Sequence, residues 1–103
     1  MYTTKPIKKI NNHDFKKLLQ EKEILISYHA LDHLSQGQRK VFKEEELIHI
    51  LKKEVPRRTY LQQNGRFAVY YRKKDGYRKI IIKIEKQKAK IITFMNNSEL
   101  PKK

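Results

Sequence analysis

Two turns that contain glycine divide the second half of the chain into segments of alternating apolar and polar residues. Asn64-Gly65 precedes RFAVYYRKK, and Asp75-Gly76 precedes YRKIIIKI. An Asn-Gly or Asp-Gly pair between alternating segments is typical of a tight β-hairpin. With RRTYLQQ before the first turn and AKIITFM after a short polar turn, the pattern predicts a four-stranded antiparallel meander over residues 57–96.

The alternation also predicts which side chains share a face of this sheet, because successive residues of a strand point to opposite sides. Two-residue turns would place three apolar pairs opposite one another, namely Phe67 and Ile84, Val69 and Ile82, and Tyr71 and Ile80. We expect this face to form the core. The opposite face would then carry Arg66, Ala68, Tyr70, Arg72, Tyr77, Lys79, Ile81, Lys83, Lys90, Ile92 and Phe94.

The first half of the chain has a helical period instead. Apolar residues at helical spacing predict a first helix over 12–22, a second from Ser27 to near Gly37, and a third that opens with three glutamates and ends before Pro56. We therefore expect an α+β fold in which three helices pack on one face of the four-stranded antiparallel meander. The chain would be a single domain, residues 1–103, with a helical part at 10–55, a sheet part at 57–96 and frayed tails at 1–8 and 97–103.

Composition narrows the chemistry available to this domain. The chain has no cysteine, which excludes structural disulfides, thiolate catalysis and zinc sites built on cysteine. No apolar run approaches the roughly 18 residues of a membrane span, and the start MYTTKPIKKI lacks the apolar segment of a secretory signal. We expect a cytoplasmic protein without membrane contact, cofactor or metal ion.

Charge indicates the kind of partner. The 103 residues carry 25 Lys and Arg against 11 Asp and Glu, a net charge of +14. Residues 57–90 alone hold 12 basic and 2 acidic side chains, so most of the excess lies on the predicted sheet. Such an excess attracts polyanions, and RNA or another nucleic acid is the partner we expect. The alternative is a lysine content that only reflects biased genomic composition.

The cationic side of the predicted sheet is the candidate binding surface. Arginine and lysine neutralise phosphates, and tyrosine offers a flat ring to unstacked bases. The predicted nucleic-acid contacts are Arg66, Tyr70, Arg72, Lys79 and Lys83. The alternative is an ordinary solvated face, because a half-buried sheet must place polar residues outside. Ile81, Ile92 and Phe94 on the same side predict that a helix, the N-terminal segment or a partner chain covers part of it.

Two histidines four residues apart, His29 and His33 in SYHALDHL, are the candidate catalytic pair. Beside a phosphate, one could remove the ribose 2′-OH proton while the other protonates the leaving 5′-oxygen. The alternative is that His29 makes a hydrogen bond at a helix start and His33 is surface. A zinc site is disfavoured because the glutamate of H-E-x-x-H is missing. We interpret His13 and His49 as surface or packing residues.

The order SYHALDHL, EEELIHIL, NGRFAVYYRK and KIITFM resembles an uncharacterised family of small domains with a Ser-x-His-Ala start. That family is similar to the RelE-like and BrnT-like toxin superfamily, small basic α+β proteins of which many cleave RNA. The resemblance covers about residues 24–96. It implies a RelE-like fold, metal-independent endoribonuclease activity and an acidic antitoxin protein as partner. The positions that it singles out are His29, His33, Arg66, Arg72 and Thr93.

Two departures from the family pattern bear on the acid/base assignment. Many relatives have arginine where His33 stands, and a compact Arg-Gly-Ile segment where this chain has GQRKVF. Thr93 also has a structural interpretation, because the predicted register places it on the core face opposite Ile80. Three hypotheses therefore stay open: an RNA-binding domain that cleaves RNA, a non-catalytic nucleic-acid or protein-binding module on the same scaffold, and a toxin-like domain held by an acidic antitoxin.

Overall fold

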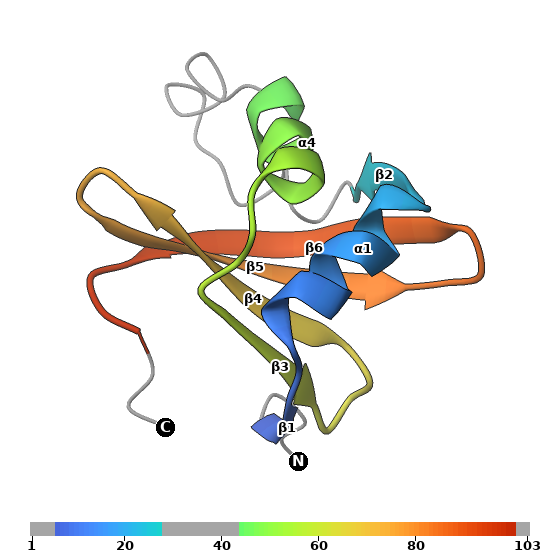
Figure 1. Cartoon of the computed structure of the whole chain (residues 1–103), viewed down its shortest axis with the longest axis horizontal. Coiled ribbons are helices and arrows are strands. Elements are labelled where there is room, and N and C mark those ends of the chain that lie inside the picture. Colours follow the sequence, from blue (N-terminus) through green and yellow to red (C-terminus); the bar gives the residue numbers. More distant parts are fainter. Residues whose placement is uncertain (1–5, 28–43, 101–103) are drawn as a thin grey trace.

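The computed structural model describes residues 6–27 and 44–100, and these form one mixed β-sheet with two α-helices (Figure 1). The sheet has six strands in the order β1-β3-β4-β5-β6-β2. The elements along the chain are β1 (Pro6–Lys9), α1 (Asn12–Gln20), β2 (Glu23–Ile26), α4 (Glu44–Lys53), β3 (Arg58–Gln62), β4 (Phe67–Lys73), β5 (Gly76–Ile84) and β6 (Lys88–Asn97).

The predicted architecture of three helices on a four-stranded antiparallel sheet was wrong in two respects. β1, which falls largely in the predicted frayed tail, pairs antiparallel with β3, and β2, predicted as a link, pairs parallel with β6. Strands of four residues are too short to show a period, and pairing with a neighbouring strand decides their conformation. The predicted helix from Ser27 to Gly37 lies almost wholly outside the described residues.

The register of the β4–β5 hairpin differs from the predicted one by two residues. Phe67 lies opposite Ile82, Val69 opposite Ile80, and Lys73 opposite Gly76. The turn is therefore Lys74-Asp75, and Gly76 is the first residue of β5 rather than part of the turn. A shift by two residues keeps every side chain on its predicted face, because the side-chain period of a strand is two.

A β-bulge in β6 reverses two further predictions. Ile82 lies opposite Ile91, but Ile81 lies opposite Thr93, so Ile92 is the extra residue. Beyond the bulge the alternation is inverted. Phe94 therefore lies opposite Ile80 and packs against the core, not on the cationic side as predicted. Thr93 lies on the opposite face, not in the core.

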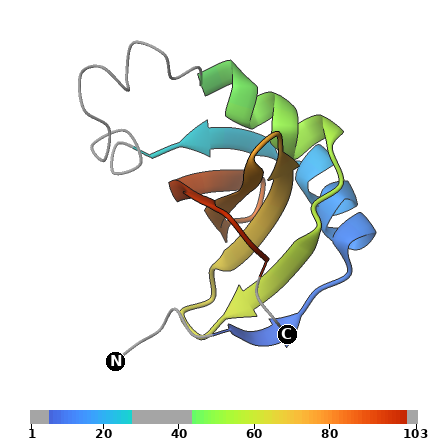
Figure 2. The ribbon, with the colours of Figure 1, turned by 90° about the vertical axis from the view of Figure 1, so that its left-hand side faces the viewer.

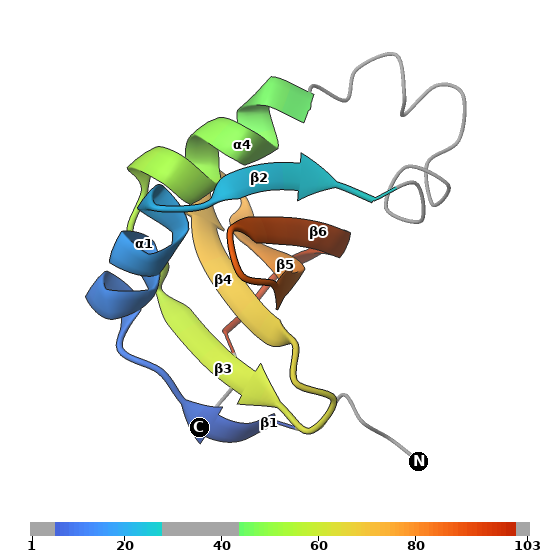
Figure 3. The same cartoon turned by 90° about the vertical axis from the view of Figure 1, so that its right-hand side faces the viewer.

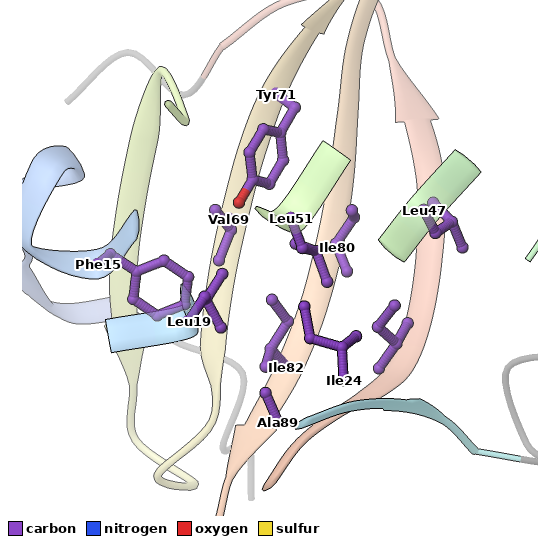
Figure 4. Close-up of a cluster of buried hydrophobic side chains, with 11 residues drawn as sticks. Phe15, Leu19, Ile24, Leu47, Leu51, Val69, Tyr71, Ile80, Ile82 and Ala89 are labelled. Carbon is purple, nitrogen blue, oxygen red and sulfur yellow. The ribbon is translucent and has the colours of Figure 1, made fainter. Parts of the chain in front are cut away.

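Both helices cover the same face of the sheet, and Figures 2 and 3 show them side by side there. The core combines buried side chains from the helices and from four strands, and Figure 4 labels all of them except Ile91. Its members are Phe15, Leu19, Ile24, Leu47, Leu51, Val69, Tyr71, Ile80, Ile82, Ala89 and Ile91. Neither described helix is long and apolar enough to cross a membrane.

Lys52 connects the two helices. Its ammonium group donates to the carbonyl oxygens of Leu19 at 3.3 Å, Gln20 at 3.4 Å and Lys22 at 2.7 Å. These carbonyls belong to the last turn of α1 and the residues just beyond it, where oxygens lack partners within the helix. A cation at this position also complements the negative end of the helix dipole.

We expect Lys52→Met to lower the free energy of unfolding by about 1–2 kcal/mol, because the substitution removes the charged donor but keeps most of the apolar stem. Lys53→Met is the matched control, since Lys53 is the next residue of α4 and is exposed. Urea denaturation of the two variants measures the difference. Equal losses in both variants would show that the three carbonyl contacts contribute nothing.

Candidate nucleic-acid interface

The face of the sheet opposite the helices has a second, smaller apolar cluster. Tyr60, Ala68, Tyr70 and Ile81 are 4–8% exposed, and Ile92 and Leu100 pack against them. Leu100 follows β6, so the segment after that strand covers part of this face. The sequence predicted that something covers Ile81 and Ile92; the chain itself supplies part of that cover, through a segment predicted to be a frayed tail.

Four cationic side chains lie on this same face, and we call them the cationic face: Arg66, Arg72, Lys79 and Lys83. Arg72, Lys79 and Lys83 alternate along their strands with Tyr71, Ile80 and Ile82 of the helix-side core, and Arg66 directly precedes Phe67, the first residue of β4. Arg72 and Lys83 are exposed, whereas Arg66 and Lys79 are half-buried. Because residues 66 and 72 are six apart on an extended chain, the face spans roughly 20 Å. The predicted set of cations is therefore on one side of the sheet.

Aromatic rings hold two of these cations in place. Arg72 donates from Nη1 to the Tyr77 hydroxyl at 3.3 Å, and its guanidinium carbon lies 5.3 Å from the centre of the same ring. Lys79 lies with Nζ 5.7 Å from the centre of the Tyr70 ring, and these two residues are direct partners across β4 and β5. Contacts of this kind restrict the cations to orientations over the sheet.

Tyr70, the predicted stacking residue, has little surface to offer a base. It is 5% exposed, and its ring meets Tyr60 edge-on with centroids 6.2 Å apart. Burial, and secondarily the charge of an ionised Tyr60, raises the pKa of Tyr70, so the phenol stays neutral at physiological pH. Tyr77 is half-buried and is the better-exposed aromatic beside the cations.

The other end of the cationic face is a shallow hollow of about 480 Å³ beside the first hairpin turn. Arg66 and Lys83 both line it, together with Asn64, Gly65 and Ile84. The turn is fixed by a hydrogen bond from the Arg66 backbone N–H to the Asn64 side-chain oxygen at 2.9 Å. This arrangement leaves two cations from neighbouring strands around one hollow.

Sequence reasoning missed a larger pocket, of about 580 Å³, where β3 begins and β4 ends. We call it the arginine pocket; its lining residues are Asn12, His13, Glu54, Val55, Pro56, Arg57, Arg58 and Arg72. A neighbouring hollow of about 410 Å³ is lined by Arg57, Arg58 and Arg72 again, with Tyr77 and Leu100. The only signal in the sequence is the Arg57-Arg58 pair after Pro56, and that pair does not reveal which distant residues approach it.

Asn12 fixes the geometry of this pocket. Its side chain donates from Nδ2 to the Arg57 carbonyl oxygen at 3.2 Å and accepts, at Oδ1, a hydrogen bond of 3.0 Å from the hydroxyl of buried Thr59. The Arg57 backbone N–H donates to the Tyr70 carbonyl oxygen at 2.7 Å. The start of α1, which carries His13, is thereby held against the start of β3.

The histidines divide into two groups. His29 and His33, the predicted catalytic pair, lie outside the described residues. His13 lines the arginine pocket, while His49 is exposed on α4 beside Glu45 and Glu46. Over residues 6–27 and 44–100, no group of three His, Cys, Asp or Glu side chains is placed to hold a metal ion.

Comparisons with known proteins decide nothing about ancestry. No family model, curated protein or solved structure matches this chain. The RelE-like and BrnT-like resemblance therefore stays a prediction that rests on the short sequence motifs alone.

Proposed function

We propose that this protein binds single-stranded RNA, with the sugar-phosphate backbone lying along the cationic face. The observation that carries the proposal is the common orientation of Arg66, Arg72, Lys79 and Lys83 on the sheet face opposite the helices. Within the described residues, none of these four cations forms an ion pair with a carboxylate. An unpaired row of this kind lowers the free energy of a bound polyanion by releasing its counterions.

Aromatic contacts favour binding over the alternative of an ordinary solvated face. A solvated lysine or arginine would keep its rotamer freedom, whereas Arg72 and Lys79 rest on Tyr77 and Tyr70. Ordering them before binding lowers the entropic cost of the contact with a phosphate. A single strand suits this surface because the half-buried Tyr77 can stack on a base that is unpaired.

RNA cleavage by a RelE-like or BrnT-like toxin domain is a narrower hypothesis on the same surface. Its predicted groups, His29 and His33, lie outside the described residues, so binding is the part of the proposal that the described geometry supports. An acidic antitoxin would compete with RNA for the same cations. The affinity of the cationic face for RNA can therefore be measured whether or not the chain cleaves RNA.

We expect Lys79→Gln/Lys83→Gln to weaken the binding of a short single-stranded RNA by about 10-fold at moderate salt. Each lost phosphate contact should also reduce the slope of log affinity against log salt by about 0.7, so the double variant should lose about 1.4. Fluorescence anisotropy over a range of salt concentrations measures both quantities.

The matched control is Lys17→Gln/Lys53→Gln, which removes the same charge from two exposed lysines on α1 and α4, on the other side of the sheet from the cationic face. Only a small loss of affinity is expected there. Were the two double variants equally weak, RNA would be responding to net charge alone. That outcome, or no measurable binding by the wild type, would reject the cationic face as a binding site.

A further inference from the structure

The arginine pocket concentrates positive charge that the described residues do not neutralise. Arg57, Arg58 and Arg72 line it and also line the neighbouring hollow, so the two hollows share three arginines. Within residues 6–27 and 44–100, no carboxylate lies at ion-pair distance from any of them. Glu54 is the acidic residue of the lining. The three arginines and the one glutamate of the lining together carry a net charge of +2.

Three guanidinium groups around one pocket suit a phosphate. Arginine presents a rigid fork of N–H donors that matches phosphate oxygens, and such charge-assisted hydrogen bonds are about twice as strong as neutral ones. The charge distinguishes two kinds of phosphate. A diester inside a strand carries one negative charge, whereas a monoester carries about 1.5 to 2 at pH 7. The net charge of the pocket matches the monoester.

Position links the pocket to the cationic face. Arg72 belongs to both, and Tyr77 holds its guanidinium by the hydrogen bond and ring contact described above. Arg58 is half-buried and donates from Nη1 to the Arg57 carbonyl oxygen at 2.9 Å, which orients its side chain at the pocket wall. A strand lying along the cationic face therefore reaches the pocket at the end of that face where β3 begins.

We propose that the arginine pocket binds the terminal phosphate monoester of an RNA strand, so that the protein discriminates phosphorylated ends from hydroxyl ends. This inference rests on the proposed RNA binding and adds to it a specificity for the strand end. Arg57, Arg58 and Arg72 would donate to the phosphate oxygens. The negative charge of Glu54 repels the phosphate and so limits the affinity of the pocket for it.

The test uses the full chain and RNA oligonucleotides of one sequence, about eight nucleotides long, with a 5′-phosphate, a 3′-phosphate or two hydroxyl ends. We expect one of the two phosphorylated forms to bind at least about 10-fold more tightly than the hydroxyl form, because charge-assisted contacts of the end are gained. A hydroxyl-ended oligonucleotide one nucleotide longer controls for added charge, and it should gain about 2-fold or less.

Two variants locate the effect. The side chain of Arg57 is exposed, and only its backbone N–H and carbonyl oxygen form hydrogen bonds within the fold, so Arg57→Gln should leave the fold intact. This variant should reduce the preference for the phosphorylated end to about that of the longer control. Glu54→Gln should instead enlarge the preference, since it removes the one opposing charge. Lys79→Gln/Lys83→Gln should weaken all oligonucleotides alike and keep their ratio.

The outcomes separate the two proposals. Equal affinity for phosphorylated and hydroxyl ends, with RNA bound, overturns the terminal-phosphate inference and leaves the cationic face in place. A preference that survives Arg57→Gln and does not change with Glu54→Gln overturns the assignment to this pocket. Failure of every oligonucleotide to bind overturns both proposals.

Discussion

Gly76→Ala is expected to lower the free energy of unfolding by about 3 kcal/mol. Gly76 has a backbone φ of +136°, a conformation that is strained for any residue with a side chain. A Cβ at this position would also lie 2.6 Å from the carbonyl oxygen of Asn97 and 3.3 Å from the Cα of Ser98. Since both contacts are with backbone, the clash is relieved only by moving the end of β6 away from β5.

Gly65→Ala is the matched control. Gly65 also has a positive φ, +84°, but an added Cβ would meet nothing within 4 Å. Its substitution should therefore cost only the conformational strain, about 1 kcal/mol. Urea denaturation of the two variants isolates the contribution of the clash. If Gly76→Ala proved no more destabilising than Gly65→Ala, the close approach of Asn97 would not constrain the fold.

Gly76 also matters to the proposed binding surface. It precedes Tyr77, which lies opposite Asn97 on one side and opposite Arg72 on the other. A displacement of β6 at Asn97 would therefore shift the ring that holds Arg72. Gly76→Ala is expected to weaken RNA binding as well as the fold.

The parts of the fold that the sequence predicted correctly are those with a long local period. β4 and β5 alternate over seven and nine residues, and the helix-side residues Val69, Tyr71, Ile80 and Ile82 are buried as expected. The predicted hairpin register was wrong by two residues, because an Asp-Gly pair predicts a glycine inside the turn, whereas Gly76 is the first residue of β5. Local residue type alone does not distinguish these two arrangements.

Errors elsewhere arose from interactions between distant residues. The strand β2 exists because it pairs with β6, about 65 positions further along the chain, and no pattern within Glu23–Ile26 indicates that pairing. The bulge at Ile92 leaves no mark in IITFM, yet it exchanges the faces of Thr93 and Phe94. Both features depend on tertiary pairing, which outweighs local propensity in short strands.

The candidate site could be predicted only in part, because some of its features depend on strand alternation and others on contacts between distant residues. Arg66, Arg72, Lys79 and Lys83 follow from strand alternation, whereas the buried state of Tyr70 depends on Tyr60 and on the segment after β6. The arginine pocket joins His13 and Arg57 through the Asn12 hydrogen bond, across 45 positions of the chain. A contact of that separation has no signature in one sequence.

Tyr71→Phe should leave the fold at least as stable as the wild type at neutral pH and make it markedly more stable in alkali. Tyr71 is 1% exposed at one end of the core (Figure 4), and its hydroxyl has no hydrogen-bond partner among the described residues. Removing a buried and unpaired hydroxyl costs nothing in hydrogen bonding and relieves its desolvation penalty. We expect a gain of up to about 1 kcal/mol at pH 7.

The alkaline effect follows from the ionisation of this phenol. Burial, and secondarily the charge of Glu54, raises the pKa of Tyr71 far above the ordinary value of 10.0, so the folded protein keeps the proton that the unfolded chain releases. The free energy of unfolding of the wild type must then fall by up to about 1.4 kcal/mol per pH unit above pH 10. Phenylalanine has no such proton.

The stability advantage of Tyr71→Phe should therefore grow to about 2–3 kcal/mol near pH 11.5, and urea denaturation from pH 7 to 11.5 measures it. If the difference in free energy of unfolding between the two proteins stayed constant with pH, Tyr71 would ionise as readily in the folded protein as in the unfolded chain. That result would contradict the burial of its hydroxyl in the core.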